Sequence, residues 1–164
     1  MLLYRNFFRF AGVFLIFFCA PSWGLDQIGR LGIGVTQQLK NDLPGISFKL
    51  QKSESFAMGG ILGLSTSDNN GGYGAGLKFY RNMFEEPQLN FYSAVMGALI
   101  KKKSKTTNES GFQFDLTLGS EFSFSGLHSL GFSFEFGISL NKLNDFIVET
   151  VGYQFVVAAV HFYL

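Results

Sequence analysis

Hydrophobic and polar residues alternate strictly in two stretches of this chain. Residues 112–118 read Phe-Gln-Phe-Asp-Leu-Thr-Leu, and residues 132–140 read Phe-Ser-Phe-Glu-Phe-Gly-Ile-Ser-Leu. A period of two places successive side chains on opposite faces of a strand. Both stretches are therefore predicted to be β-strands with one strongly apolar face and one polar face that carries charges.

The same pattern, divided by turn signals, predicts eight strands over the rest of the chain. They are expected at residues 28–38, 46–52, 56–65, 73–80, 89–101, 111–124, 130–140 and 146–164. The pattern leaves open which face of the third, fifth and eighth strands is apolar. Eight is an even number, as single-chain bacterial membrane barrels require, and the three most polar connections would lie at one end of such a barrel. These connections are 66–72, 102–110 and 141–145.

The polar faces of the predicted strands carry charges of both signs. A membrane barrel turns its apolar faces to lipid and its polar faces inward, which is the reverse of a soluble sandwich. Charges inside a barrel need partners or water, so we expect a paired interior network. Its members are Arg30, Lys49, Lys78, Asp115, Glu121 and Glu135. The predicted fold is all-β, an eight-stranded antiparallel up-and-down transmembrane β-barrel, whose interior side chains just fill without leaving an open diffusion pore.

The N-terminal residues have the layout of a secretory signal peptide. Arg5 and Arg9 precede an apolar run at 10–20, and small residues before residue 25 offer a cleavage site. The run is too short for a membrane-spanning helix, which needs about 20 residues. We therefore expect a signal peptide at 1–24 and a single barrel domain at 25–164. Removing the leader leaves 11 of the 13 basic residues against 12 acidic ones, so no nucleic-acid partner is expected.

These features together resemble the small outer-membrane barrels of Gram-negative bacteria typified by outer membrane protein A. The resemblance rests on the leader, the eight alternating strands, the segment 119–137 and the aromatic-rich C-terminal strand. In such families the last strand carries an assembly signal with alternate apolar positions, which here are Val160, Phe162 and Leu164; the final residue is Leu where the family usually has Phe. The resemblance implies an outer-membrane location, contact with outer-membrane lipid and lipopolysaccharide, and recognition by the barrel-assembly machinery and periplasmic chaperones. A monomer is expected.

Candidate chemistry is sparse. Some barrels of this kind resemble lipid A acylases or deacylases, which need a His with a Ser and an acidic partner, but His128 and His161 are both expected at the periplasmic rim, away from such a substrate. We therefore predict no enzyme, no cofactor and no metal site. Four lysines in the 102–110 region and just before it are expected to lie on an outer loop near lipopolysaccharide phosphates. They are Lys101, Lys102, Lys103 and Lys105.

Two function classes follow from this sequence. The favoured one is a small outer-membrane barrel with a structural or surface-interaction role, which contributes to envelope integrity or contacts lipopolysaccharide. The alternative is a secreted soluble β-barrel or β-sandwich that carries apolar ligands. The large aromatic content, with 21 Phe among 164 residues, favours the first class because few residues remain to form a charged surface.

Overall fold

The computed structural model describes residues 28–164 apart from 42, 68–69, 105–107 and 153–154. The expected signal peptide at 1–24 lies outside the described residues, and so does Lys105. Within the described part the regular structure consists of nine strands and no helix. They are β1 (Leu31–Thr36), β2 (Gly45–Ser53), β3 (Phe56–Ser65), β4 (Asn70–Glu86), β5 (Leu89–Ser104), β6 (Asn108–Phe122), β7 (Leu130–Lys142), β8 (Phe146–Thr150) and β9 (Val156–Tyr163).

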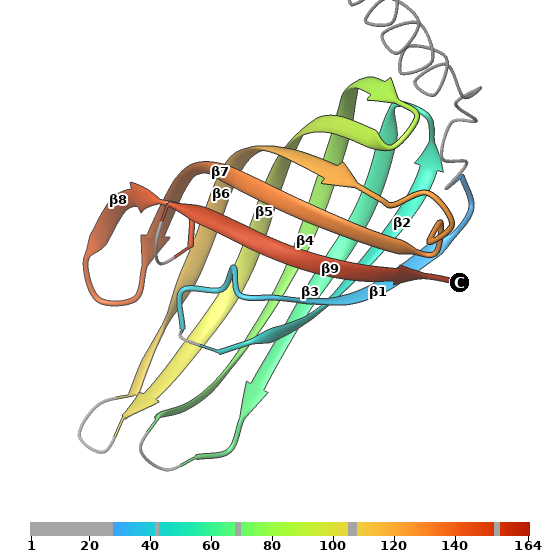
Figure 1. Cartoon of the computed structure of the whole chain (residues 1–164). Helices are drawn as coiled ribbons and strands as arrows, with labels where there is room; N and C mark the ends of the chain where they lie inside the picture. The colour runs from blue at the N-terminus through green and yellow to red at the C-terminus, as the bar shows by residue number, and fades with distance from the viewer. Residues whose placement is uncertain (1–27, 42, 68–69, 105–107, 153–154) are drawn as a thin grey trace, which may run out of the picture.

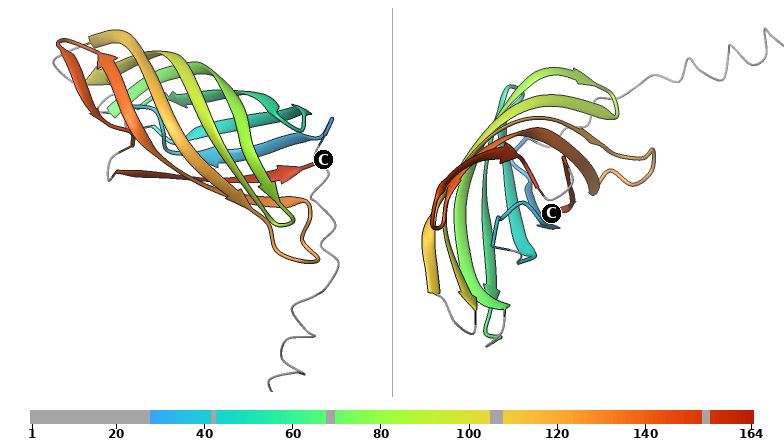
Figure 2. Two further views of the ribbon diagram at one scale, coloured as in Figure 1. Left: turned by 90° about the horizontal axis from the view of Figure 1, so that it is seen from above. Right: turned by 90° about the vertical axis from the view of Figure 1, so that its left-hand side faces the viewer.

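The strands form a closed antiparallel barrel of eight strands, in which β8 continues the wall beyond β9 (Figure 1). From β1 to β7 each strand pairs with its sequence neighbours. The ring is closed by β9, which pairs with β1 on one side and with β7 on the other. We call the end that holds the C-terminus and the start of β1 the near end, and the opposite end the far end; Figure 2 shows the barrel from two more directions.

Strands β1–β7 and β9 alternate outward side chains, which are mostly apolar, with inward side chains that are polar or small at most positions and apolar at a few, among them Ile61 and Met96. On β6, Phe114 and Leu116 are exposed, whereas Asp115 and Thr117 between them are buried. The three strands whose facing the sequence left open follow the same rule. Tyr92 of β5 and His161 of β9 point into the barrel, and so does Ile61 of β3.

The C-terminal segment 146–164, predicted as one strand, is divided into β8 and β9. The chain breaks between them at Gly152 and Phe155, which have φ angles of 71° and 73°. A left-handed backbone conformation cannot continue a strand and is costly for a residue with a side chain. In the described part of the chain β8 pairs only with β7, so its other edge has no neighbouring strand there.

The hairpins at both ends are longer than the sequence predicted. At the near end the turn between β4 and β5 is reduced to Pro87 and Gln88, and at the far end β5 continues to Ser104. Lys101, Lys102 and Lys103 consequently lie in a paired strand, where a loop was predicted. Lysine has a low strand propensity, but the hydrogen bonds to β4 and β6 hold these residues in register. Tertiary context overrides so small a preference.

The connection between β1 and β2 folds into the barrel. Gln38, Leu39 and Asn41 are 1–2% exposed, as fully buried as the interior strand residues. This connection, residues 37–44, closes the far end of the interior. The sequence predicted the end of the 28–38 strand followed by a turn here, and no segment inside the barrel.

Candidate functional site: the barrel interior

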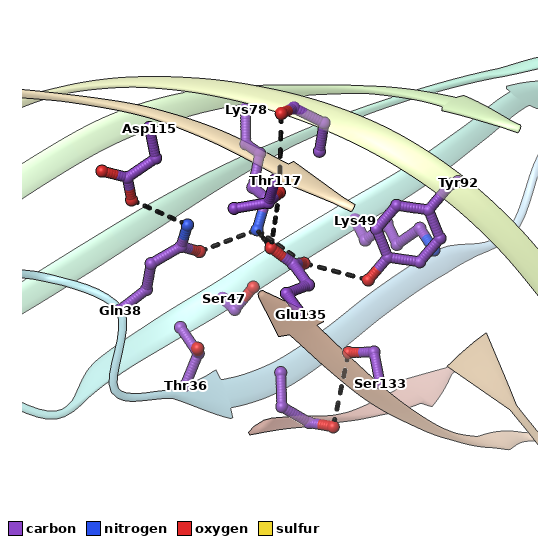
Figure 3. A network of polar contacts seen from close by, with 12 residues as sticks. Thr36, Gln38, Ser47, Lys49, Lys78, Tyr92, Asp115, Thr117, Ser133 and Glu135 are labelled. Atoms are coloured by element: carbon purple, nitrogen blue, oxygen red, sulfur yellow. Dashed lines mark hydrogen bonds and ion pairs between the residues drawn. The ribbon is translucent and has the colours of Figure 1, made fainter. Parts of the chain in front are cut away.

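The centre of the interior is an ion pair between β4 and β7 (Figure 3). Lys78 Nζ lies 2.7 Å from Glu135 Oε1 and also donates to Gln38 Oε1 at 2.7 Å. The carboxylate of Glu135 accepts further hydrogen bonds from the hydroxyls of Tyr92 at 2.9 Å and Thr117 at 3.0 Å. Both charges are therefore paired and hydrogen-bonded, which is the condition for burying them at acceptable cost.

A second ion pair lies nearer the C-terminus. Lys49 Nζ contacts Glu121 Oε2, and both side chains are 2% exposed. The hydroxyl of Tyr163 donates to the other oxygen, Glu121 Oε1. The Lys49 ammonium also lies 4.9 Å from the ring centroid of Tyr80 and 5.0 Å from that of Tyr92, where the negative ring faces favour a cation.

Asp115 is held by neutral donors and has no direct cation partner in the described residues. Its oxygens accept hydrogen bonds from Ser139 Oγ at 2.6 Å, Gln38 Nε2 at 2.9 Å and Gln113 Nε2 at 2.9 Å. Gln38 comes from the inward-folded connection, so the carboxylate joins that connection to the barrel wall. Gln38 also links Asp115 to Lys78, and this makes one continuous network.

Arg30, the sixth charge placed inside from the sequence, lies at the near-end rim. Its Nη2 donates to the carbonyl of Tyr163 at 2.8 Å and to Ser129 Oγ at 3.1 Å. The structure therefore brings the other five interior charges together, four of them as two ion pairs. It does not bring Arg30 to an acidic side chain; the guanidinium instead fastens the C-terminal residues to the rim.

Two inward glycines make room for these charges. A Cβ at Gly119 would lie 2.7 Å from Glu135 Cγ and 2.8 Å from Tyr92 Cζ. A Cβ at Gly131 would collide with Glu121 Oε1 and lie 2.9 Å from the ring of Tyr163. Glycine is needed at both positions because the side chains of neighbouring strands occupy the space above it.

The far half of the interior holds an apolar cluster beside buried polar side chains such as Gln38, Gln113 and Asn141. Leu39 of the inward-folded connection packs against side chains of β3 and β5, with one partly buried residue beyond β7 covering the cluster. The members are Leu39, Ile61, Met96, Ala98, Ile100 and Leu143. In the described part of the chain the interior therefore holds two ion pairs toward the near end, and the Leu39 cluster with polar side chains beside it toward the far end.

Sequence reasoning missed one polar contact in the interior. Ser47 Oγ lies 2.9 Å from His161 Nε2, so His161 is inside the barrel and the prediction of a rim histidine is wrong for it; His128 is exposed in the turn before β7. A Ser–His contact is one half of a nucleophile–base pair. Here both side chains are at most 2% exposed, and no described residue hydrogen-bonds to His161 Nδ1, so the contact lacks both access and an orienting acid.

The remaining candidate residues lie on the outer wall and its rim. Val160, Phe162 and Leu164 alternate with the inward-facing His161 and Tyr163. Lys101 and Lys103 have the outward parity of β5, whereas Lys102 has the inward parity and pairs with Glu109 in the ladder. The three described lysines of this group are thus divided between the two faces of β5.

The described residues contain no group of three or more side chains suited to binding a metal ion. No helix among them has the length and hydropathy needed to cross a membrane. Comparisons with protein-family models, with curated proteins and with solved structures found no match to this chain. The resemblance to the outer membrane protein A group stays a prediction.

Proposed function

We propose that this protein is an outer-membrane barrel with a structural or surface-contact role, whose outer wall faces lipid and whose interior conducts nothing. Its partners would be outer-membrane lipid and lipopolysaccharide, together with the barrel-assembly machinery and chaperones that deliver it. No catalytic activity is part of this proposal.

The distribution of large apolar side chains carries the proposal. Exposed Leu, Ile, Val, Met and Phe residues occur on all eight wall strands, while Lys49, Lys78, Glu121 and Glu135 are buried. Soluble proteins rarely expose contiguous apolar patches of more than a few hundred Å², and here the apolar surface encircles the barrel. A lipid-facing wall around a polar interior is the arrangement of membrane barrels.

The filled interior argues against the alternative, a soluble carrier of apolar ligands. A carrier needs an apolar cavity of some hundreds of Å³. In this barrel the space that lipocalin-like folds use for a ligand holds two ion pairs and the inward-folded connection.

Fluorescence quenching in lipid vesicles tests the proposal. With the single Trp23 replaced by Phe, a reporter is introduced either outward, as Leu116→Trp, or inward, as Tyr80→Trp. Bromine on the lipid tails should quench the outward reporter strongly and the inward one weakly, and the folded protein should migrate faster in unboiled than in boiled SDS gels because all wall hydrogen bonds are internal.

The two reporters act as controls for each other, since both replace one large apolar or aromatic residue on the barrel wall. If neither reporter is quenched and the protein remains in solution after the vesicles are floated away, the membrane proposal is wrong. That result would favour the soluble alternative.

A further inference from the structure

The outer wall is hollowed toward its far end. A groove of about 970 Å³ crosses the outward faces of β3 to β8, a volume near the upper end of the roughly 300–1,000 Å³ typical of small-molecule sites. Gly97 of β5 forms part of its floor, and a Cβ there would meet nothing within 4 Å. The walls include Leu77, Leu99, Phe112 and Phe114.

The lining selects for an apolar occupant. The four wall residues have hydrocarbon side chains that are 43–70% exposed. They are Leu77, Leu99, Phe112 and Phe114. A polar molecule would lose its hydration in this groove without gaining hydrogen bonds. An extended hydrocarbon chain would instead bury its own apolar surface together with that of the groove.

Cations lie along the far-end lip of the groove. Lys101 is two residues beyond Leu99 on β5 and pairs with Ser110 of β6; Lys142 of β7 pairs with Phe112. Adjacent strands are about 4.8 Å apart and rise about 3.4 Å per residue. Because the β6 partners of Lys101 and Lys142 lie two residues apart, the backbones of the two lysines are separated by roughly 12 Å. The side chains of the two lysines are long enough to contact one phosphate placed between them. The exposed side chain of Ser110 lies beside this position and carries a hydroxyl group.

The acids nearest this lip in the sequence are Glu109 and Asp145. Glu109 has the inward parity of Asp115, pairs with Lys102 in the ladder and accepts a hydrogen bond from Asn144. Lys101 lies over the outward ring of Tyr73, with its Nζ 6.0 Å from the ring centroid. The outward strand positions of the lip thus carry two cations above the apolar groove, and the exposed Asp145 lies in the connection that follows Lys142.

We propose that this groove binds one acyl chain of the lipid A part of lipopolysaccharide, with a lipid phosphate held between Lys101 and Lys142. The inference rests on the proposed membrane location. The lipid contact that the sequence predicted for a loop is thus assigned to the groove and its lip. The ligand must carry a phosphate and a hydrocarbon chain in the same molecule. Lysine serves as a point-charge partner for phosphate.

Native mass spectrometry of the full chain, folded in detergent micelles, tests the proposal. The probes are purified lipid A, dephosphorylated lipid A and phosphatidylcholine, each added in the same series of concentrations. We expect one lipid A to remain bound per barrel, with dephosphorylated lipid A and phosphatidylcholine bound at least tenfold more weakly.

Two variants address the two halves of the site. Lys101→Gln with Lys142→Gln should weaken lipid A binding at least tenfold and leave the dephosphorylated lipid unaffected. Gly97→Phe fills the groove without meeting protein atoms at its Cβ and should abolish one-to-one binding of both lipids.

Matched controls carry the same changes elsewhere on the outer wall. Arg81 and Lys52 are exposed cations toward the near end, so Arg81→Gln with Lys52→Gln removes the same charge away from the lip. Ala158 is an exposed residue of β9, a strand that contributes nothing to the groove lining, so Ala158→Phe adds the same ring away from the groove. Both controls should bind lipid A as the unmodified chain does.

Several outcomes overturn the inference. They are equal retention of lipid A and phosphatidylcholine, lipid A binding that survives Gly97→Phe, and a dimer that Gly97→Phe dissociates, which would make a second copy the occupant. Each of these outcomes counts against the inference only when the protein still migrates faster in unboiled gels and its outward reporter is still quenched. Loss of those two signals would instead contradict the proposed function.

Discussion

The two halves of the barrel interior are filled differently, because both ion pairs lie toward the near end whereas the Leu39 cluster lies toward the far end beside buried polar side chains. Toward the near end, Lys49 and Lys78 pair with Glu121 and Glu135. Toward the far end, Leu39 packs in an apolar cluster. The near half is surrounded by strands that are hydrogen-bonded on both edges, whereas at the far end β1 stops at Thr36 and, among the described residues, β8 has a strand on one side only.

The difference shows that the kind of side chain buried inside the barrel depends on how completely the surrounding strands are hydrogen-bonded. A buried ion pair is favourable only when rigid surroundings hold its geometry and satisfy its remaining donors and acceptors. The closed ladder supplies that rigidity in the near half. Where the ladder is interrupted, the chain folds its own connection inward and closes the barrel by hydrophobic burial, which tolerates looser geometry.

The largest expected effect comes from breaking an ion pair in the near half. Glu121→Leu leaves the Lys49 ammonium buried without its carboxylate, so the free energy of unfolding should fall by about 3–5 kcal/mol. Urea unfolding in lipid vesicles measures it. The double variant Lys49→Met with Glu121→Leu should recover much of the loss, and a double variant as unstable as the single one would show that the pair does not act as a unit.

The matching test in the far half removes the central apolar side chain. Leu39→Ala should lower the free energy of unfolding by about 2–3 kcal/mol, the lower part of the usual range for such truncations, because the 37–44 connection can relax into the space. Leu64→Ala serves as control, since Leu64 is 77% exposed on the outer wall near the same end. An effect of the same size in both variants would contradict the role assigned to Leu39.

A smaller change tests how tightly the near half is packed. Gly131→Ala places a methyl group against the Glu121 carboxylate and the Tyr163 ring, and overpacking of this kind should cost about 1–2 kcal/mol. Gly97→Ala adds the same methyl group in open space and should be neutral in the same urea titration. Equal stability of the two variants would mean that the network readily shifts aside.

The smallest effect is expected at the junction of the inward-folded connection with β8. Lys40 Nζ donates to the carbonyls of Thr150 at 2.9 Å and Gly152 at 2.6 Å, and lies 3.3 Å from Glu149. Lys40→Met should lower global stability by less than about 1 kcal/mol, since the partner carboxylate is exposed. Hydrogen exchange of the β8 amides should nevertheless become faster, while the same substitution at Lys52 should leave it unchanged.

Alternation in the sequence was sufficient to predict the wall. A strand such as 112–118 has one possible facing once one side must be apolar, and this pattern alone places Asp115 and Glu135 inside the barrel. The segments 56–65 and 89–101 lack such contrast because small and apolar residues occupy both faces, so their orientation depends on neighbouring strands.

Other features depend on contacts between distant residues and carry no local signal. The sequence predicts the end of the 28–38 strand and then a turn in the 37–44 connection, yet Leu39 is buried by Ile61 and Met96 of other strands. The contact of Ser47 with His161 joins residues 114 positions apart. The break between β8 and β9 is anticipated only by Gly152, and glycine is a weak signal in a chain whose strands contain many glycines.

The seam between β1 and β9 has a consequence for the order of events during biogenesis. Gly32 pairs with Tyr163 there, so the ring cannot close until β9 has been synthesised. Contacts this distant in sequence are formed slowly, and unpaired apolar strand edges promote aggregation. A chain that lacks β9 therefore leaves the edge of β1 open, and its apolar strands are prone to aggregate in water.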